Sequence, residues 1–272
     1  MTRVIITGAT GFLGRHLLSK LSGEFELVPV SRGQHTGMVQ VTNYASVPDG
    51  DLLIHLAEEP DRAVASLAGD AYVEASTELV RTLSRRFAGR IIYASSGAVY
   101  GDSGDAPFRI HDPLVSSDTY TRAKISGEAA VLDEGGAVVR LANLFGPGMS
   151  KNNVMSDILR QIPGEGPLLV RDDKPVRDFL AVDDAVKLFT LLAGCRINGV
   201  LNAGSGVGTR IQALAETALA LYGEIGREII ATQPTLRSSV NVLNVEETAR
   251  AVGWTASLSL AEHMDIYFFG KS

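Results

Sequence analysis

Residues 116–128 read "SSDTYTRAKISGE" and place a phenol, Tyr120, four positions before an ammonium group, Lys124. Side chains at this spacing lie on the same face of a helix. A phenol has a pKa near ~10 in water, too high for proton transfer at neutral pH, and a nearby cation lowers that pKa. The pair therefore fits a tuned acid/base group, although the same spacing also occurs on ordinary helix surfaces.

A second chemical pattern lies at the N-terminus, where "TGATGFLG" spaces three glycines three residues apart. The apolar run "RVIIT" precedes it and an amphipathic stretch follows, which is the strand-to-helix context of a dinucleotide-binding turn. Glycine allows the tight turn, the approach of the backbone to a pyrophosphate and close helix packing, while the N–H groups at the helix start bind phosphate. The residues expected at the cofactor are Gly8, Thr10, Gly11, Phe12, Leu13 and Gly14.

The end of the second expected strand indicates which dinucleotide is bound. NAD-binding proteins usually carry an acid there, which accepts a hydrogen bond from the ribose 2′-OH. This chain reads "VPVSRGQ", so Ser31 and Arg32 stand in that place. A guanidinium suits the 2′-phosphate of NADP. We expect NADP, with NAD possible; the alternative for Arg32 is an exposed arginine in a turn.

These residues need elements that position them, and the first 145 residues alternate apolar runs with amphipathic ones. Such alternation predicts parallel βαβ units in a sheet covered on both faces. The expected fold class is α/β, a Rossmann-like doubly wound parallel sheet. The expected strands are "RVIITG", "ELVPV", "DLLIHLA", "RIIYASS" and "GAVVRLAN", and the expected helices are "FLGRHLLSKL", "AYVEASTELVRTLSRRF" and "YTRAKISGEAAVL".

After about residue 145 the pattern changes to loops rich in Gly, Pro and charge, followed by helices. The spacings Thr209–Gln212, Asn244–Glu247 and Ser259–Glu262 predict capping boxes at three helix starts. We expect a smaller α+β C-terminal substrate lobe. The cofactor domain would comprise residues 1–145 with a returning segment at about 178–204, and the lobe residues 146–177 and 205–272.

The composition narrows the class of protein. The 272 residues are 45% hydrophobic and 21% charged, with a net charge of -6, which disfavours a nucleic-acid or anionic-membrane partner. The single cysteine, Cys195, fits a reducing compartment. No apolar run is long enough for a membrane span, and the N-terminus lacks the pattern of a signal peptide. We expect a cytoplasmic protein with a small-molecule substrate and no metal.

A series of motifs extends in order over nearly the whole chain. They are "TGATGFLG", "DLLIHLA", "RIIYASSGAVYG", "YTRAK", "VVRLANLFGPG", "VRDFLAVDDAV", "VLNAGSG" and "AVGWTASLSLAEHM". The ordered set resembles the extended short-chain dehydrogenase/reductases, the NAD-dependent epimerase/dehydratase family. The resemblance implies about seven parallel strands, a small C-terminal nucleotide-sugar domain and, in many members, a homodimer formed through helices matching residues 70–87 and 120–134.

The resemblance also implies roles for particular residues. Ser96 matches the catalytic serine or threonine, Tyr120 the acid/base tyrosine and Lys124 its partner, which also holds the nicotinamide ribose; Ser95 is the alternative to Ser96. Leu56 and Ala57, at the end of "DLLIHLA", match cofactor contacts. The matching substrate contacts are Asn143, Arg177 and Arg237, the arginines toward a diphosphate; the alternative for Arg177 is a salt bridge to Asp178, Asp183 or Asp184.

The resemblance leaves several reactions open. Gly97 and Ala98 stand where dehydratases carry ionisable carboxyl groups, which disfavours dehydration. We expect a nucleotide-sugar oxidoreductase, and Arg32 favours a 4-keto-sugar reductase that uses NADPH. The alternatives are a C4 epimerase that retains NAD and a non-catalytic dinucleotide-binding sensor or scaffold, although such proteins typically lack the tyrosine or the lysine. Among the departures from the family pattern, Ser76 stands where many members carry Asn.

Overall fold

A computed structural model describes residues 1–21, 23–58 and 62–270. Its main element is a parallel sheet in the order β10-β6-β5-β4-β1-β2-β3. From β1 the chain extends the sheet first on one side and then on the other, so the sheet is doubly wound and the predicted fold class is confirmed. The strands are β1 (Arg3–Thr7), β2 (Glu26–Ser31), β3 (Val39–Gln40), β4 (Leu52–His55), β5 (Ile91–Ser96), β6 (Ala137–Leu141) and β10 (Gly199–Ala203).

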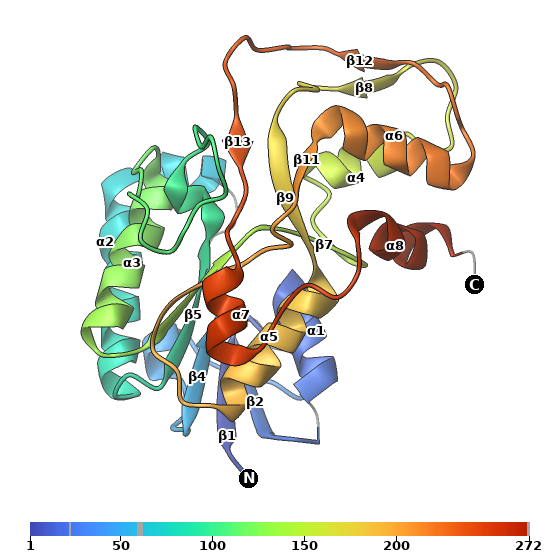
Figure 1. The fold of residues 1–272 in the computed structure, drawn as a ribbon. Helices are drawn as coiled ribbons and strands as arrows, with labels where there is room; N and C mark the ends of the chain where they lie inside the picture. Colours follow the sequence, from blue (N-terminus) through green and yellow to red (C-terminus); the bar gives the residue numbers. More distant parts are fainter. Residues whose placement is uncertain (22, 59–61, 271–272) are drawn as a thin grey trace.

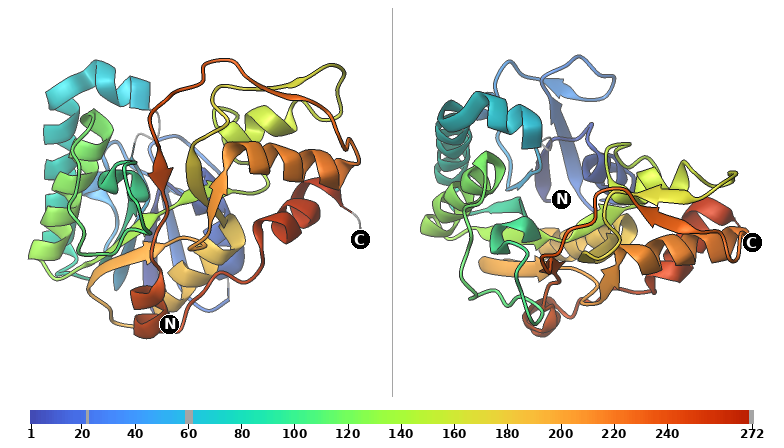
Figure 2. Two further views of the ribbon diagram at one scale, coloured as in Figure 1. Left: turned by 45° about the horizontal axis from the view of Figure 1, so that its top comes forward. Right: turned by 90° about the horizontal axis from the view of Figure 1, so that it is seen from above.

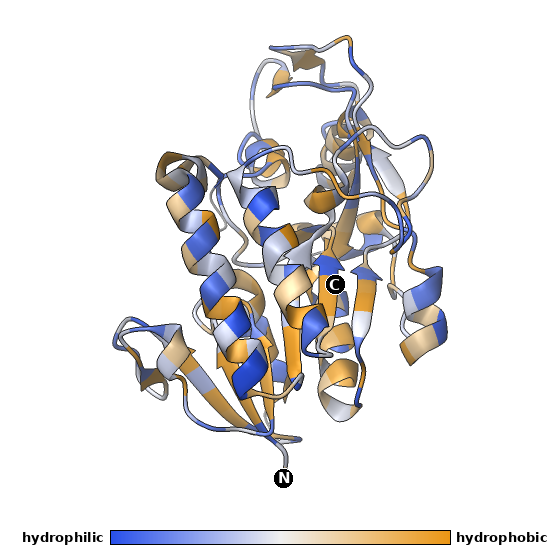
Figure 3. Ribbon diagram, turned by 90° about the vertical axis from the view of Figure 1, so that its left-hand side faces the viewer, coloured by the Kyte–Doolittle hydropathy of each residue, from blue (hydrophilic) through white to orange (hydrophobic). Residues whose placement is uncertain are grey.

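Helices cover both faces of this sheet (Figure 1). Helices α2 (Arg62–Arg86) and α3 (Thr119–Asp133) pack together on one face, and α1 (Phe12–Leu21) and α5 (Val182–Gly194) pack on the other. Because successive side chains of a strand point to opposite faces, β1 serves two cores: Ile5 lies in the first, Val4 and Ile6 in the second. In Figure 3 the strands are mostly hydrophobic, whereas the outer faces of α2 and α3 are largely hydrophilic.

The remaining elements form a smaller α+β lobe beside the carboxyl ends of the strands (Figure 2). Its four-stranded sheet has β9 (Val176–Ala181) paired with β7 (Asn143–Phe145), β11 (Gly208–Arg210) and β13 (Val240–Asn241), and a second pair joins β8 (Leu168–Val170) to β12 (Ile229–Ala231). Its core contains Phe145, Phe179 and Met264. Its helical segments are α4 (Val154–Leu159), α6 (Ile211–Tyr222), α8 (Leu260–Met264) and η3 (Asp265–Phe269), whereas α7 (Glu246–Val252) packs against β10 of the main sheet.

The chain returns from the lobe to the main sheet. β10 pairs with β6, and α5 packs against α1, so residues 182–203 complete the larger body after the lobe has begun. β9 overlaps the start of the predicted returning segment but pairs instead within the four-stranded sheet of the lobe. The two bodies are therefore interleaved along the sequence and are not joined by one linker.

Helix starts show which capping predictions hold. The Ser259–Glu262 capping box is present at α8. The predicted boxes Thr209–Gln212 and Asn244–Glu247 are wrong, because α6 and α7 begin after Arg210 and Val245, neither of which caps with its side chain. Helix α3 has a capping box that the sequence reading missed: Asp118 accepts from the N–H of Thr121, whose hydroxyl accepts from the N–H of Asp118.

Candidate functional site

The glycine turn after β1 is packed so tightly that a side chain would not fit. Gly8 has φ of 70°, and a Cβ there would lie 2.8 Å from the carbonyl carbon of Leu56 and 2.9 Å from the nitrogen of Ala57. A Cβ on Gly14 would lie 2.8 Å from the Cα of Ala9, so α1 could not stay this close to the turn. The turn thus presents bare backbone and the first N–H groups of α1, which fits a dinucleotide pyrophosphate.

The other residues expected at the cofactor divide into backbone and side-chain candidates. Leu13 is buried in the core, so only its backbone can face a ligand. Ser31 is also buried, and its hydroxyl accepts from the N–H of Gly33 at 3.1 Å. The guanidinium of Arg32 lies over the ring of Tyr44, 5.5 Å from its centroid, on an exposed turn. Arg32 is thus the charged side chain available here for a 2′-phosphate.

The predicted acid/base pair lies at the start of α3, where the Asp118 cap fixes the first turn. Lys124 Nζ is 5.8 Å from the centroid of the Tyr120 ring, so the two side chains share one helix face. Lys124 is buried and donates a hydrogen bond to the carbonyl oxygen of Ala94 at 2.6 Å. Ala94 lies on β5 two residues before Ser96, so this bond ties the helix to the strand that carries the predicted serine.

The two serines at the end of β5 have different surroundings. Ser95 is buried and donates to Glu128, which also forms a buried ion pair with Arg140. Ser96 is half-buried and begins the turn η2 (Gly97–Tyr100), where its hydroxyl accepts from the N–H of Ala98 at 3.2 Å. Ser95 is therefore committed to internal packing, and Ser96 remains the candidate for substrate contact.

A carboxylate that the sequence reading missed lies beside this pair. The side chain of Glu58 is 7% exposed and forms an ion pair with Lys124. Its carboxylate accepts hydrogen bonds from the hydroxyls of Tyr93, at 2.6 Å, and Ser76, at 2.9 Å. The available signal was the position of Glu58 just after "DLLIHLA", because the carboxyl ends of parallel strands meet at one edge of the sheet.

Burial and charge act against each other in this cluster. Burial lowers the pKa of Lys124, but Glu58 and then Tyr120 outweigh it, so the pKa lies above its ordinary value. Burial raises the pKa of Glu58, yet Lys124 and His55 bring it below its usual value. His55 is fully buried, and desolvation lowers its pKa to about 4 despite the nearby Glu58 carboxylate. The cluster therefore holds a charged pair beside a neutral imidazole.

The predicted diphosphate arginines meet at a different carboxylate from those expected. Arg237 binds Asp102 through two hydrogen bonds of 2.8 and 2.6 Å, and Arg177 Nη2 lies 3.9 Å from the same carboxylate. Arg177 also donates to the carbonyl and hydroxyl oxygens of Ser239. Hydrogen bonds from Arg237 are the largest effect lowering the pKa of Asp102. Two guanidiniums thus converge on one anion.

The salt bridges expected as the alternative for Arg177 do not occur. Asp178 is buried and accepts hydrogen bonds from the backbone and hydroxyl of Ser205, Asp183 accepts from Tyr267, and Asp184 accepts from Ser257. The other predicted substrate residue, Asn143, is exposed and donates to the carbonyl oxygen of Asp178 at 3.0 Å.

A further arginine reaches the tyrosine. The guanidinium of Arg62, at the start of α2, lies 5.2 Å from the centroid of the Tyr120 ring. Its Nη1 is 3.5 Å from the carboxylate of Asp118, the cap of α3. Cations therefore lie near Tyr120 from two directions, Lys124 from within its own helix and Arg62 from the neighbouring one.

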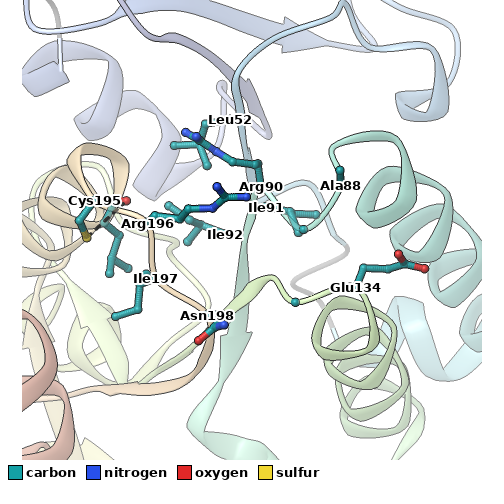
Figure 4. Close-up of a pocket in the computed structure, with 13 residues that line it drawn as sticks. Leu52, Ala88, Arg90, Ile91, Ile92, Glu134, Cys195, Arg196, Ile197 and Asn198 are labelled. Carbon is teal, nitrogen blue, oxygen red and sulfur yellow. Dashed lines mark hydrogen bonds between the residues drawn. The ribbon is translucent and has the colours of Figure 1, made fainter.

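Figure 4 shows a cavity of about 450 Å³ that lies away from the predicted site residues. It opens at the amino ends of the strands, between Leu52 at the start of β4, Ile91 at the start of β5 and the segment Cys195–Asn198 before β10. None of the predicted site residues lines it. Within the described ranges, no helix is long and apolar enough to cross a membrane, and no three His, Cys, Asp or Glu residues gather as a metal site.

The doubly wound sheet and the glycine turn after its first strand are those of a Rossmann-like α/β protein. Residues 4–204 match the model of the NAD dependent epimerase/dehydratase family, and the chain belongs to that family. The family resemblance inferred from the motifs is confirmed.

Individual relatives differ in their reactions. The chain is 30% identical to GDP-6-deoxy-D-mannose reductase from Pseudomonas aeruginosa over 268 residues, covering 86% of this chain and 84% of the relative. It is 27% identical to UDP-glucose 4-epimerase from Mycolicibacterium smegmatis, covering 96% and 95%. A solved structure of RMD from Pseudomonas aeruginosa complexed with NADPH superposes with a TM-score of 0.81 at 22% identity, covering 97% and 96%.

Proposed function

We propose that this protein is an NAD(P)-dependent oxidoreductase that interconverts a hydroxyl and a carbonyl group on the sugar of a nucleotide sugar. The supporting observation is that Tyr120 and Lys124 share one face of α3 while Lys124 is bonded to β5 two residues before Ser96. A relative named as a nucleotide-sugar reductase and one named as an epimerase, each matched over most of the chain, support the substrate class.

In this proposal NADP is the cofactor, and NAD can also bind. The turn at Gly8 and the start of α1 hold the pyrophosphate, since the glycines leave no room for side chains in the turn and the first N–H groups of a helix have no partner within it. Arg32 pairs with the 2′-phosphate, for which a planar guanidinium offers two parallel donors. The bound dinucleotide supplies or accepts the hydride.

The side chains of the protein carry the proton chemistry. During reduction the Tyr120 hydroxyl gives its proton to the carbonyl oxygen of the sugar, and Ser96 donates a hydrogen bond to the same oxygen. An ammonium group has three donors. Lys124 uses one on the carbonyl oxygen of Ala94 and forms an ion pair with Glu58, and in the proposal a remaining donor binds the ribose hydroxyls.

Arg177 and Arg237 bind the diphosphate of the substrate. In the structure both face Asp102, which occupies them as an anionic partner. A diphosphate carries more charge than one carboxylate and can accept from both guanidiniums, so it can take the place of Asp102. Asn143, exposed at the start of β7, contacts the sugar in this arrangement.

Among the possible reactions we favour reduction of a 4-keto sugar by NADPH. Gly97 and Ala98, next to Ser96, cannot ionise and so cannot supply the additional acid and base of a dehydratase. Arg32 favours NADP, the dinucleotide used for reduction. C4 epimerisation with retained NAD is the second candidate, favoured by the match to an epimerase over 96% of the chain.

The test begins with mass spectrometry of the purified protein under native conditions. Tightly retained NAD would favour the epimerase, whereas an empty site or exchangeable NADP is expected for the reductase. The protein is then mixed with NADPH and a panel of 4-keto nucleotide sugars while the absorbance of NADPH is followed. Dinucleotide binding without turnover across the panel would support a sensor instead. We also propose a homodimer, which light scattering coupled to size-exclusion chromatography checks.

A further inference from the structure

Glu58 is a buried carboxylate beside a residue of the proposed mechanism, and that mechanism gives it no role. Its side chain is 7% exposed and that of Lys124 is 9% exposed. We propose that Glu58 is a positioning residue that keeps Lys124 in the ammonium form and in a fixed place beneath Tyr120. The importance of Glu58 for catalysis rests on the proposed function, but its effect on the charge and position of Lys124 does not.

The contacts of Glu58 explain how it can fix a flexible side chain. A lysine has four rotatable side-chain bonds, and ordering it costs conformational entropy. Here the ammonium is held from two sides, by the carbonyl oxygen of Ala94 on β5 and by the Glu58 carboxylate after β4. These two acceptors determine where the ammonium lies and leave it a third donor.

Glu58 is itself held by two hydroxyl donors. Tyr93 comes from β5 and Ser76 from α2, at 2.6 and 2.9 Å. In this chain the helix position of Ser76 thus serves the Glu58 carboxylate. The carboxylate is therefore held by contacts within the protein, and Lys124 meets a rigid partner.

The charge of Glu58 is needed because Lys124 is buried. Desolvation disfavours an ammonium group, and a buried lysine without an anionic partner tends to lose its proton near neutral pH. Among the neighbouring groups, Glu58 has the largest effect in raising the pKa of Lys124. The titratable groups that face the pair from each packed element are His55 of β4, Tyr93 of β5, Tyr120 and Glu128 of α3 and Tyr72 of α2.

The first experiment observes Lys124 directly, without substrate or cofactor. The chain has six lysines, so protein labelled with ¹³C at lysine Cε gives a spectrum in which Lys124→Arg identifies one signal. In the wild type we expect this signal to stay that of an ammonium up to the highest pH at which the protein remains folded. In Glu58→Gln it should titrate at least about one pH unit below the surface lysines, a tenfold loss of proton affinity.

Matched controls separate this effect from general charge and from misfolding. Glu78→Gln removes the same charge from the exposed face of α2, where Glu78 pairs with Arg81, and should leave the Lys124 signal unmoved. Tyr93→Phe removes one donor to Glu58 but keeps the carboxylate, so its shift should be much smaller. If Glu58→Gln does not fold, Glu58→Asp provides the measurement, with a shift of the Lys124 titration larger than that of Tyr93→Phe and smaller than the shift of about one pH unit expected for Glu58→Gln. A Lys124 titration unchanged by loss or shortening of the carboxylate overturns the proposal.

The second experiment asks whether the position of Lys124 matters to the site. NADPH affinity is measured by fluorescence titration for wild type, Glu58→Gln and Glu58→Asp. For Glu58→Gln we expect a dissociation constant of NADPH about tenfold higher than that of the wild type, because the ammonium group of Lys124 is no longer held in place. Glu58→Asp should recover part of the affinity. A shifted lysine with unchanged NADPH affinity would overturn the positioning role. An absence of turnover on every sugar nucleotide would count against the proposed function alone, because neither readout requires a substrate.

Discussion

Tyr120 and Lys124 are held very differently. Lys124 is buried between a carbonyl and a carboxylate, whereas Tyr120 is half-buried, lies between the cations of Arg62 and Lys124, and has a hydroxyl with no hydrogen-bond partner among the described residues. A fixed cation beside a free hydroxyl is suited to proton exchange with a ligand. Substitutions at the two positions should therefore have different consequences.

Tyr120→Phe removes the hydroxyl and keeps the ring. General acid/base groups contribute roughly 10²- to 10⁴-fold to rate, so we expect a loss of that order in kcat on an identified substrate. The dissociation constant of the dinucleotide should change little. Lys124→Met should impair both quantities, because in the proposed mechanism Lys124 also holds the ribose hydroxyls. A Tyr120→Phe protein that keeps most of its activity would falsify the proposed proton transfer.

Arg32→Asp tests the cofactor preference. Charge-assisted hydrogen bonds are worth about 1.5 to 3 kcal/mol each, so their loss should weaken NADP binding roughly tenfold or more. The new carboxylate repels a 2′-phosphate and accepts from a bare 2′-OH, so the preference should reverse toward NAD. Ser31→Ala should act more weakly, since its hydroxyl is already bonded to Gly33. The measurement is the dissociation constant of each dinucleotide at one salt concentration. An unchanged ratio would mark Arg32 as an ordinary turn residue that packs on Tyr44.

The residues of the site were predictable to different degrees. Tyr120 and Lys124 follow from helical spacing, and the glycines follow from a strand-to-helix turn; in each case the partners are close in sequence. Glu58 was missed because its partners, Lys124 and Tyr93, are 66 and 35 positions away, a relation that only the packed sheet establishes. Asp102 was missed for the same reason, because Arg237 reaches it across 135 positions.

Among the elements, α1 depends most clearly on a single missing side chain. Gly14→Ala places a Cβ 2.8 Å from the Cα of Ala9, and neither backbone can yield without moving the helix. We expect a loss of about 1–3 kcal/mol in the free energy of unfolding, as for other overpacked sites, together with weaker dinucleotide binding. Denaturant unfolding and fluorescence titration give the two quantities.

Gly194→Ala is the control for the preceding change. Gly194 is also a helical glycine, at the end of α5, and a Cβ there meets no atom within 4 Å. The substitution should leave both stability and binding close to the wild type. Equal behaviour of the two variants would contradict a role for close packing at Gly14.

The elements were predicted well where periodicity was long and poorly where a boundary depended on a cap. The strands and helices around the main sheet lie within a few residues of the apolar runs, except that α2 begins at Arg62, earlier than the expected residue 71, and passes through Gly69 with φ of 58°. Two of three predicted capping boxes are absent, since such a spacing creates a cap only if the helix starts there. The domain division by residue number stays a prediction.

The whole molecule should lose stability in mild acid through one buried imidazole. His55 has its pKa lowered by burial from 6.5 to about 4, so between these values the unfolded chain binds a proton that the folded protein does not. Stability contributed by the neutral form is present above pH 6.5 and is lost as the pH falls toward 4. Between pH 7 and pH 5 the loss from this group is about 2 kcal/mol.

Urea unfolding of wild type and His55→Gln at the two pH values checks this expectation. The variant lacks the titrating group, so its stability should fall less between pH 7 and pH 5, whatever its absolute stability. Subtracting the loss of unfolding free energy of the variant from that of the wild type gives the contribution of His55, because the carboxylates are common to both proteins. Equal falls would mean that the imidazole is protonated inside the folded protein or that it is hydrated there.

The interleaved path of the chain has a consequence for biosynthesis. β6 is made by residue 141, but β10, which covers its outer edge, is not complete until residue 203. While the ribosome adds the intervening residues, β6 presents unpaired backbone groups of the kind that recruit foreign strands. A nascent chain stalled within this interval is thus the form most exposed to aggregation, and the one that a chaperone would have most reason to bind.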